Sequence, residues 1–465
     1  MNFDDIVDKL SDELIQKTQE IIRIPSVKGT ALLGKPFGQG VSDALDYMLN
    51  LGKSMGFKTK NLDGYIGYIE YGEGSELVGI LAHLDVVPEG RNWTYPPYAA
   101  EIHDGKIYGR GAIDDKGPAM AVLYAMKSVK NSGVKLNKRI RLILGLDEES
   151  GWECMKHYKQ VEEIPSCAFT PDADYPVIHA EKGIVSYQFS QKTNNADLPI
   201  RIMTIKGGNR PNMVPDFCET VLAVNPDQFE KAVQEMKSII DAKNFNINIH
   251  LEGYKIILES HGKSAHGSTP QKGINAISQL MVVIYELYKK FNIEHPFINF
   301  YGENISLEIN GELLDCAMED DVSGNLTFNV GLIDGNEEYM KAIANIRYPV
   351  TYNESEIYNR IVNKAKQYGI QVEQIDLQKP LYVPKDHPLV QKLMKVYRDF
   401  TGDSNSEAVS IGGGTYARAM DNAVAFGAAF PGEPELAHEK DEYISIESLI
   451  KNAKIYARAI YESCK

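Results

Sequence analysis

The sequence is poor in cysteine and has no long apolar run. Its five cysteines are scattered over 465 residues and include no Cys-x-x-Cys pair, a usage that predicts free thiols in a reducing compartment. The first residues contain neither the basic nor the apolar segment of a signal peptide. No apolar run reaches the length that spans a membrane. We therefore expect a cytoplasmic protein with no membrane partner.

Positive charge is also scarce. The chain has 49 Lys and Arg against 64 Asp and Glu, which gives a formal net charge of −15 at pH 7. Nucleic acids and anionic membranes attract basic surfaces, so this charge argues against both as partners. The composition is 43% hydrophobic, as in ordinary globular proteins, and 465 residues are enough for two or three domains.

A histidine follows a short apolar run near the start of the chain. Residues Leu77–Ala82 are typical of a buried parallel strand, and His83 comes directly after them. Open α/β sheets bind their ligands at this end of their strands. Asp85 is placed to accept the free ring N–H of His83, which would fix its tautomer for a metal.

Other metal-ligand residue types follow further apolar runs. Asp147, Glu148 and Glu149 follow Ile140–Leu146, Asp172 follows Cys167–Thr170, and His438 follows Ala423–Phe430. Adjacent carboxylates repel one another unless cations neutralise them. Histidine and carboxylates gathered at several strand ends predict a site for Zn²⁺, Mn²⁺ or Co²⁺. Cys154 is a further, less favoured candidate ligand.

Five motifs occur in a fixed order between residues 83 and 438. They are His83-x-Asp85, the Gly-Arg-Gly-x-x-Asp-Asp-Lys-Gly run ending at Gly117, Asp147-Glu-Glu-x-Gly, Pro171-Asp-Ala and Ala437-His-Glu. Together they resemble the di-zinc amidohydrolase and exopeptidase family, and the resemblance covers most of the chain. The Asp114–Pro118 form and the long middle region are most similar to the bacterial dipeptidases of that family.

The resemblance implies a ligand for each position of a two-zinc centre. His83 and Asp172 would bind one zinc, Glu149 and His438 the other, and Asp114 would bridge both. Each ion then keeps an open position, as catalytic zinc sites do. A bridging hydroxide would attack the substrate carbonyl.

The resemblance also implies which residues act beside the metals. Glu148 would be the general base, and Asp85 is assigned to the catalytic group with it. An extended Glu148–Glu149 segment would direct the two side chains to opposite sides. The peptide bond between Asp114 and Asp115 is expected to be cis, as is frequent in the family.

A second group of motif residues lies in the middle of the chain. His266 resembles the family histidine that stabilises the oxyanion, with His261 as a competing candidate. Asn212 resembles the family's substrate-binding asparagine. Arg347 suits the C-terminal carboxylate of a peptide. The Gly412 loop is expected to offer backbone N–H groups to the same carboxylate, which adds Gly413, Gly414 and Thr415 to the predicted site.

The order of apolar patterns predicts two domains. Residues 1–181 and 382–465 are expected to form an α/β catalytic domain, a mixed twisted sheet flanked by helices. Residues 182–381 are expected to form an inserted α+β lid. Predicted helices include 3–23, Val41–Met55, Pro226–Ala242, Asn275–Phe291, Pro388–Phe400 and Ser445–Tyr461.

These features predict a dipeptidase with two Zn²⁺ ions, acting as a monomer on small dipeptides. An N-acyl-amino-acid deacylase is the alternative, since it uses the same metals and carboxylate clamp.

Nucleotide binding is disfavoured because neither Gly109–Gly111 nor Gly412–Gly414 fits a phosphate-loop spacing. A non-catalytic binding scaffold is disfavoured because the candidate base Glu148 is present. Metal-dependent turnover of a dipeptide would separate the enzyme from both.

Overall fold

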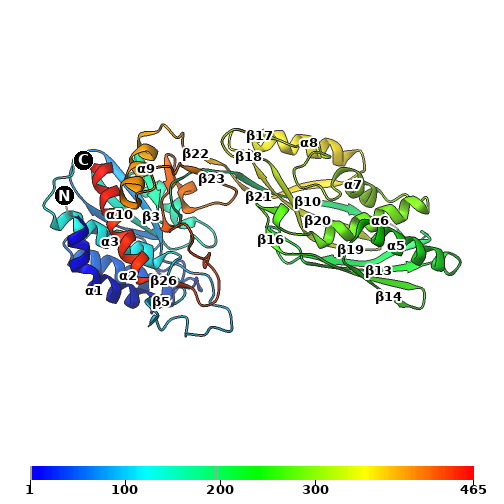
Figure 1. The fold of residues 1–465 in the computed structure, drawn as a ribbon, viewed down its shortest axis with the longest axis horizontal. Helices are drawn as coiled ribbons and strands as arrows, with labels where there is room; N and C mark the ends of the chain where they lie inside the picture. The colour runs from blue at the N-terminus through cyan, green and yellow to red at the C-terminus, as the bar shows by residue number, and fades with distance from the viewer. Residues whose placement is uncertain (1–2, 194, 196) are drawn as a thin grey trace. The chain divides into compact units, whose positions relative to one another are not determined.

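The computed structural model describes residues 3–193, 195 and 197–465, and the chain divides into two compact units. The first unit comprises the chain up to Ala180, Tyr382–Ser410 and Gly414–Lys465. The second unit comprises Glu181–Leu381 and Ile411–Gly413. In Figure 1 the blue N-terminal and red C-terminal helices accordingly belong to the same unit. The stretch 411–413, which the sequence assigns to the first domain, groups with the second.

A nine-stranded mixed sheet is centred in the first unit. Its order is β1 (Lys58–Leu62), β2 (Ile66–Tyr71), β6 (Arg139–Gly145), β3 (Leu77–His83), β7 (Cys167–Thr170), β24 (Ala423–Ala425), β9 (Ile178–Glu181) and β22 (Leu381–Tyr382), with β23 (Val409–Ile411) paired to β9. Strands β6, β3, β7 and β24 are parallel to one another. Strand β2 runs antiparallel to β1 and β6, and β9 runs antiparallel to β24. Every residue of β3 is buried, as its apolar sequence predicts.

Six helices flank this sheet: α1 (Phe3–Ile22), α2 (Gln39–Ser54), α3 (Lys116–Asn131), α4 (Glu153–Val161), α9 (Pro388–Thr401) and α10 (Ile446–Cys464). Helix α10 packs against α1, α3 and α9, and α2 packs against β1 and β2. Helix α9 begins at Pro388, where a missing N–H is tolerated, and ends at Gly402 with φ 77°. This agrees with the helix predicted from Pro388 to Phe400.

Short strands complete the first unit. They are β4 (Glu101–His103), β5 (Lys106–Tyr108) and β26 (Tyr443–Ser445), which form a three-stranded sheet, and the pair β8 (Ala173–Asp174) and β25 (Ala428–Ala429). Strand β26 leads directly into α10, whose N-cap Ser445 accepts a hydrogen bond from the Ser448 N–H.

The second unit is built on an eight-stranded antiparallel sheet. Its order is β14 (Ile247–Glu252), β15 (Lys255–His261), β13 (Phe217–Val224), β11 (Ile200–Gly207), β19 (Thr327–Asn336), β20 (Tyr339–Tyr348), β10 (Gly183–Lys192) and β21 (Gln371–Gln378). Its helices are α5 (Phe229–Lys243), α6 (Ala276–Lys290), α7 (Pro296–Asn304) and α8 (Glu354–Lys366). Two-residue strands form the pairs β12 (Met213–Val214) with β16 (Ala265–His266), and β17 (Glu319–Asp320) with β18 (Gly324–Asn325).

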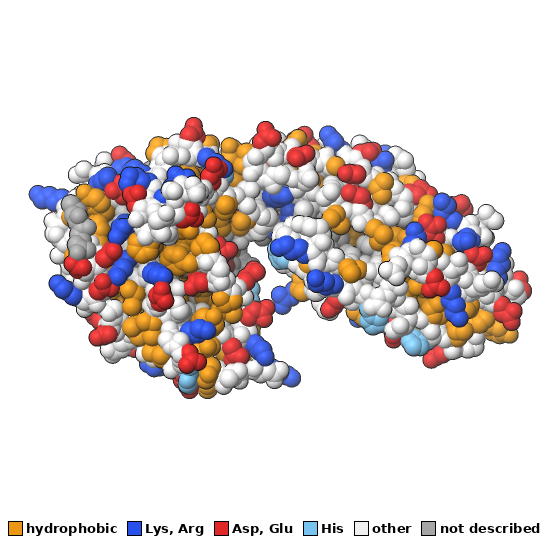
Figure 2. Space-filling model, viewed as in Figure 1, with side chains coloured by type: hydrophobic (Ala, Val, Ile, Leu, Met, Phe, Trp, Pro, Cys, Tyr) orange, Lys and Arg blue, Asp and Glu red, His pale blue; other side chains and the backbone are white. Residues whose placement is uncertain are grey.

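Helix α6 covers the sheet of the second unit. It packs on β11, β13, β15 and β19, and also against α5 and α7 (Figure 1). Eleven of its 15 residues are buried, because apolar side chains occupy most of its positions. The predicted fold class is therefore confirmed, a mixed α/β unit together with an α+β unit. Within the described residues, no helix combines the length and apolar character needed to span a membrane. Acidic and basic side chains are interspersed on the visible surface (Figure 2).

Candidate metal centre and substrate residues

The predicted metal ligands of the first unit meet at one edge of its sheet. His83 is the last residue of β3, Asp172 lies two residues beyond β7, and Glu149 lies in the turn after β6. Because β3, β6 and β7 are parallel, their carboxyl ends share this edge. Asp114 precedes α3, and His438 precedes β26.

Asp114 lies between the two histidines. Its Oδ1 is 2.9 Å from His83 Nε2, and its Oδ2 is 3.2 Å from His438 Nε2. On the first side, Asp172 Oδ2 is 3.7 Å from His83 Nε2. On the second side, Glu149 Oε2 is 3.0 Å from His438 Nε2. The five residues thus form two groups that share one carboxylate, which is the arrangement expected of a bridging ligand.

The donor atoms fit a metal. Ligand atoms of His83, Asp114 and Glu149 lie within 4.8 Å of one another, as do those of His83, Glu148 and Asp172. His83 Nε2 is buried and faces oxygens of Asp114 and Asp172 at 2.9 and 3.7 Å, but it makes no hydrogen bond of good geometry with any residue that the structure describes. Buried polar atoms are usually satisfied, and a metal ion bound by these atoms would satisfy the nitrogen. The N/O donor set suits Zn²⁺, Mn²⁺ or Co²⁺.

The electrostatics of this cluster favour added positive charge. Although burial alone lowers the pKa of His83, the Asp114 and Asp172 carboxylates hold it well above its usual value. Hydrogen bonds to Asp114 and Glu149 raise the pKa of His438 to about 10. Burial raises the pKa of the Glu148 carboxyl well above its ordinary range. The raised pKa values mean that the carboxylates favour positive charge on their neighbours, and a bound divalent cation would supply that positive charge.

Asp85 holds the histidine and the two glutamates in a way that the sequence did not predict. Its main-chain carbonyl, 2.9 Å away, accepts from His83 Nδ1, whereas its carboxylate Oδ1 lies 3.6 Å from that nitrogen. The carboxylate instead accepts the backbone N–H groups of Glu148 and Glu149, both at 3.1 Å. The ring N–H is therefore bonded to Asp85 as predicted, but the acceptor is the main-chain carbonyl, and the carboxylate lies farther from the ring.

The Glu148–Glu149 segment is a turn and is not extended as predicted. Trp152 Nε1 donates to the Glu148 carbonyl at 2.7 Å. Asp147 is fully buried and binds Lys28 Nζ at 2.6 Å, so its charge is neutralised away from the metal ligands. The peptide bond between Asp114 and its neighbour Asp115 is cis, as predicted.

A buried ion pair fixes the loop that carries Asp114. The Glu442 carboxylate accepts Arg110 Nη1 at 2.7 Å and the N–H groups of Gly111, Ile113 and Asp114 at 3.1, 2.9 and 3.2 Å. Arg110 also donates to the main-chain carbonyl of His438 at 3.2 Å. Sequence reasoning missed Glu442, although it lies four residues after the histidine motif. The pair positions both Asp114 and His438.

The predicted residues of the second unit include one close pair. Met213 pairs with His266 between β12 and β16, and the Gly267 N–H donates to the Asn212 carbonyl at 2.8 Å. Both Asn212 and His266 are exposed. His266 Nδ1 lies 2.6 Å from the Ser268 hydroxyl oxygen and 3.3 Å from the Ser268 main-chain nitrogen. Ser268 therefore orients the ring through Nδ1 and leaves Nε2 on the opposite side of the ring.

Arg347 contacts the glycine-rich loop within the second unit. Its Nη1 donates to the Gly412 carbonyl at 3.1 Å, and its Nε donates to Asn345 Oδ1 at 2.9 Å. Gly413 belongs to this unit as well. Two other predicted loop residues, Gly414 and Thr415, group with the first unit, where the Thr415 hydroxyl caps a 3₁₀ helix by accepting the Ala417 N–H. The competing candidate His261 lies on β15 beside Asn248.

A mixed sheet that gathers histidines and carboxylates around one shared aspartate defines a metallopeptidase-like hydrolase. The model of peptidase family M20/M25/M40 matches residues 79–462. The chain belongs to this family and is a metallopeptidase.

Relatives match along the full length of the chain. A Bacillus subtilis protein named "Putative dipeptidase YtjP" is 42% identical over 473 residues, covering 100% of both chains. The structure of human carnosine dipeptidase 1 has a TM-score of 0.60 at 14% identity and covers 100% of this chain and 98% of its own. An M20 metallo-carboxypeptidase from Sulfolobus solfataricus has a TM-score of 0.57 at 17% identity, covering 97% and 98%. At these identities the two structures support the fold alone.

Proposed function

We propose that this protein is a dipeptidase with a two-metal centre, acting on dipeptides that have a free C-terminal carboxylate. The observation that carries the proposal is Asp114, whose two oxygens face His83 on one side and His438 on the other. The name of the Bacillus relative supports the substrate class. His83 and Asp172 would hold one ion, and Glu149 and His438 the other.

Glu148 is the proposed general base. Its side chain lies with those of His83 and Asp172 at the centre, and Asp85 fixes the backbone of its turn. When bound, two divalent ions activate water and polarise the substrate carbonyl. Glu148 would accept the proton of the attacking water and return it to the leaving amine. Asp85 would act as a positioning residue through its two main-chain hydrogen bonds.

The substrate roles of the second unit form a separate proposal that rests on the sequence motifs. His266 would donate from Nε2 to the developing oxyanion. Arg347 and the backbone of Gly413 and its neighbours would bind the C-terminal carboxylate, and Asn212 would hydrogen-bond the peptide. We expect a catalytically competent monomer in the cytoplasm.

One substrate panel with several metals tests the proposal. The purified protein would be treated with a chelator, reloaded with Zn²⁺, Mn²⁺ or Co²⁺, and assayed on dipeptides, their C-terminal amides and N-acyl amino acids. We expect chelation to abolish dipeptide hydrolysis, metal to restore it, and the amides to be poor substrates. Faster turnover of N-acyl amino acids would favour the deacylase alternative. Full activity after verified metal removal would contradict the metal mechanism.

A further inference from the structure

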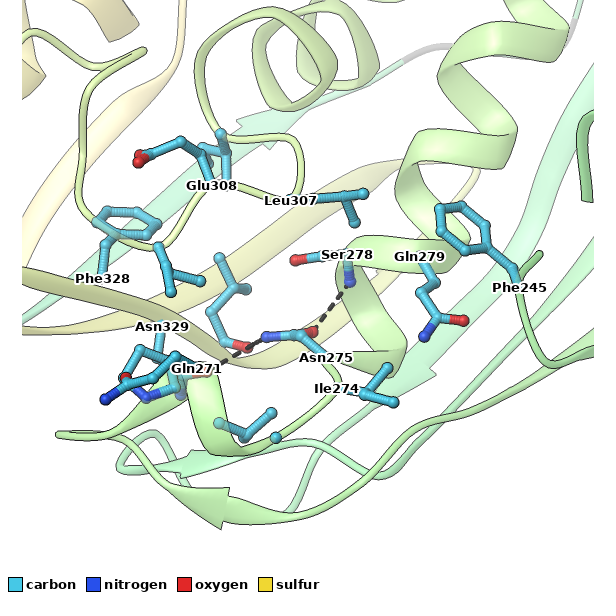
Figure 3. Close-up of a pocket in the computed structure, with 16 residues that line it drawn as sticks. Phe245, Gln271, Ile274, Asn275, Ser278, Gln279, Leu307, Glu308, Phe328 and Asn329 are labelled. Atoms are coloured by element: carbon cyan, nitrogen blue, oxygen red, sulfur yellow. Dashed lines mark hydrogen bonds between the residues drawn. The ribbon is translucent and has the colours of Figure 1, made fainter. Parts of the chain in front are cut away.

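The second unit contains a cavity that the proposed catalytic roles do not use. Its volume is about 260 Å³, and its walls include the rings of Phe245 and Phe328 (Figure 3). Ile274 and Leu307 also line it and are 50% and 47% exposed, so these two side chains form a rim that solvent reaches. The cavity is mainly apolar but open.

One polar side-chain atom in the wall of this cavity has no hydrogen-bond partner among the residues that the structure describes. Gln279, on α6, is only 5% exposed, and its Oε1 makes no hydrogen bond. The neighbouring side chain of Asn275 is paired: it accepts from the Ser278 N–H and donates to the Val330 carbonyl (Figure 3). Buried polar groups are almost always paired in folded proteins. The amide of Gln279 therefore indicates a ligand with hydrogen-bonding groups.

The composition of the cavity limits the charge and size of that ligand. The described lining residues include Glu308 but no lysine or arginine, which disfavours an anion. A volume of about 260 Å³ is below that of pockets for drug-sized ligands. The side chain of Gln279 can both donate and accept, as a peptide group does. We propose that the cavity binds one hydrophobic amino-acid residue together with its uncharged peptide group.

The cavity lies against the strand pair that carries Asn212 and His266. Val214 of β12 lines it and pairs with Ala265 of β16. On the same side, Asn329 donates to the Met213 carbonyl at 2.8 Å. A ligand in the cavity packs against this strand pair and restrains it. This restraint bears on catalysis only through the proposed role of His266, whereas binding in the cavity does not depend on that role.

Direct binding of a model ligand tests the site. N-acetyl-L-phenylalaninamide, which has neither a free amine nor a carboxylate, would be titrated into the full-length, metal-loaded protein by calorimetry. Gln279→Leu keeps the apolar volume and should weaken binding about fivefold, the effect of one hydrogen bond. Ile274→Trp, at a half-exposed position, should fill the rim and abolish binding. The matched control Gln234→Leu, at an exposed position on α5, should bind as wild type does.

Two results would overturn the proposal: no saturable binding to the wild type, or equal binding to the wild type, Gln279→Leu and Ile274→Trp. Amide hydrogen exchange tests whether a bound ligand restrains the β12–β16 strand pair. The Gly267 N–H, bonded to the Asn212 carbonyl, should exchange more slowly with the probe bound. Unchanged exchange at saturation would refute the restraint of the strand pair. Neither readout uses turnover, so failure of the dipeptidase proposal would remain distinguishable.

Discussion

Both units have an apolar core, but among the described residues the first unit buries more charged side chains than the second does. In the first unit, five charged residues are each at most 1% exposed: Asp85, Asp115, Lys116, Asp147 and Glu442. The core of the second unit is a large apolar cluster. Its candidate substrate residues Asn212 and His266 are exposed on short strands and turns.

This difference predicts which substitutions in each unit affect metal binding. A buried charge is costly unless it is paired or hydrogen-bonded, so the charged cluster depends on each of its partners. Lys116 donates to the Ile24 carbonyl at 2.7 Å, and Asp115 accepts the His83 N–H at 3.1 Å. Single substitutions in the first unit should therefore have large effects on metal binding. Substitutions at the exposed residues of the second unit should leave the metals in place.

The largest effect is expected from Asp114→Ala. Because Asp114 alone faces both histidines, its loss should remove both ions and abolish dipeptide hydrolysis. Elemental analysis of the purified variant measures this directly, and circular dichroism checks that it is folded. Retention of two ions per chain would contradict the bridging role.

Next comes Glu148→Gln, which separates the base from the ligands. The variant should keep two ions and lose about 10²–10⁴-fold in kcat, the range of general-base catalysis. Its matched control is Glu149→Gln, which should lose one ion, since Glu149 faces His438. If Glu148→Gln lost the ion and Glu149→Gln kept both, the two roles would be reversed.

His266→Ala probes the exposed site of the second unit. Loss of an oxyanion donor should lower kcat about 10²–10³-fold and leave KM nearly unchanged. Arg347→Ala should instead raise KM, because a substrate carboxylate is charged in the ground state and the transition state alike. Both variants should keep two ions. An unchanged kcat in fully metal-loaded His266→Ala would remove this histidine from the mechanism.

Much of the fold and the grouping of the candidate metal ligands could be predicted from the sequence, because the signals are local. His83, Glu149 and Asp172 each lie within three residues of an apolar run that forms a parallel strand. Parallel strands bring their carboxyl ends to one edge, so residues far apart in sequence are placed together without any knowledge of distances. The helix predicted from Pro388 to Phe400 likewise agrees with α9 to within one residue.

The supporting contacts could not be predicted from the sequence. Glu442 and Arg110 are 332 residues apart, and Lys28 and Asp147 are 119 apart. Their hydrogen bonds depend on where loops lie in space, which no spacing of residue types records. The same holds for Asp85, whose carboxylate binds main-chain N–H groups that every residue except proline offers. The substrate roles of His266 and Arg347 stay predictions.

Glu442→Gln tests one of these unpredicted contacts. An amide has one acceptor oxygen in place of two, so the variant cannot accept all four hydrogen bonds of the Asp114 loop and Arg110. Metal affinity should fall about 10–100-fold, as for other groups that orient metal ligands. Competition with a chromogenic chelator measures it. The exposed neighbour Glu439→Gln is the control, and equal affinities in the two variants would contradict the role.

The smallest effect concerns His295, a buried histidine of the second unit that has no charged partner in the described structure. It is 1% exposed, and its Nδ1 accepts the Ile298 N–H at the start of α7. Burial lowers the pKa of His295 to about 4. The unfolded chain, with a pKa near 6.5, therefore binds more protons between about pH 6.5 and 4. Stability due to the neutral ring is present above pH 6.5 and is lost as the pH falls through this window.

At pH 5 this loss should be about 2 kcal/mol of unfolding free energy relative to pH 7. His295→Asn keeps a capping acceptor that does not titrate, so its stability should fall less between the two pH values. Urea unfolding, followed by fluorescence at pH 7 and pH 5, measures the difference. The exposed His250→Asn should behave as wild type does. An equal loss in wild type and His295→Asn would contradict this role and show that the pH response arises from other groups.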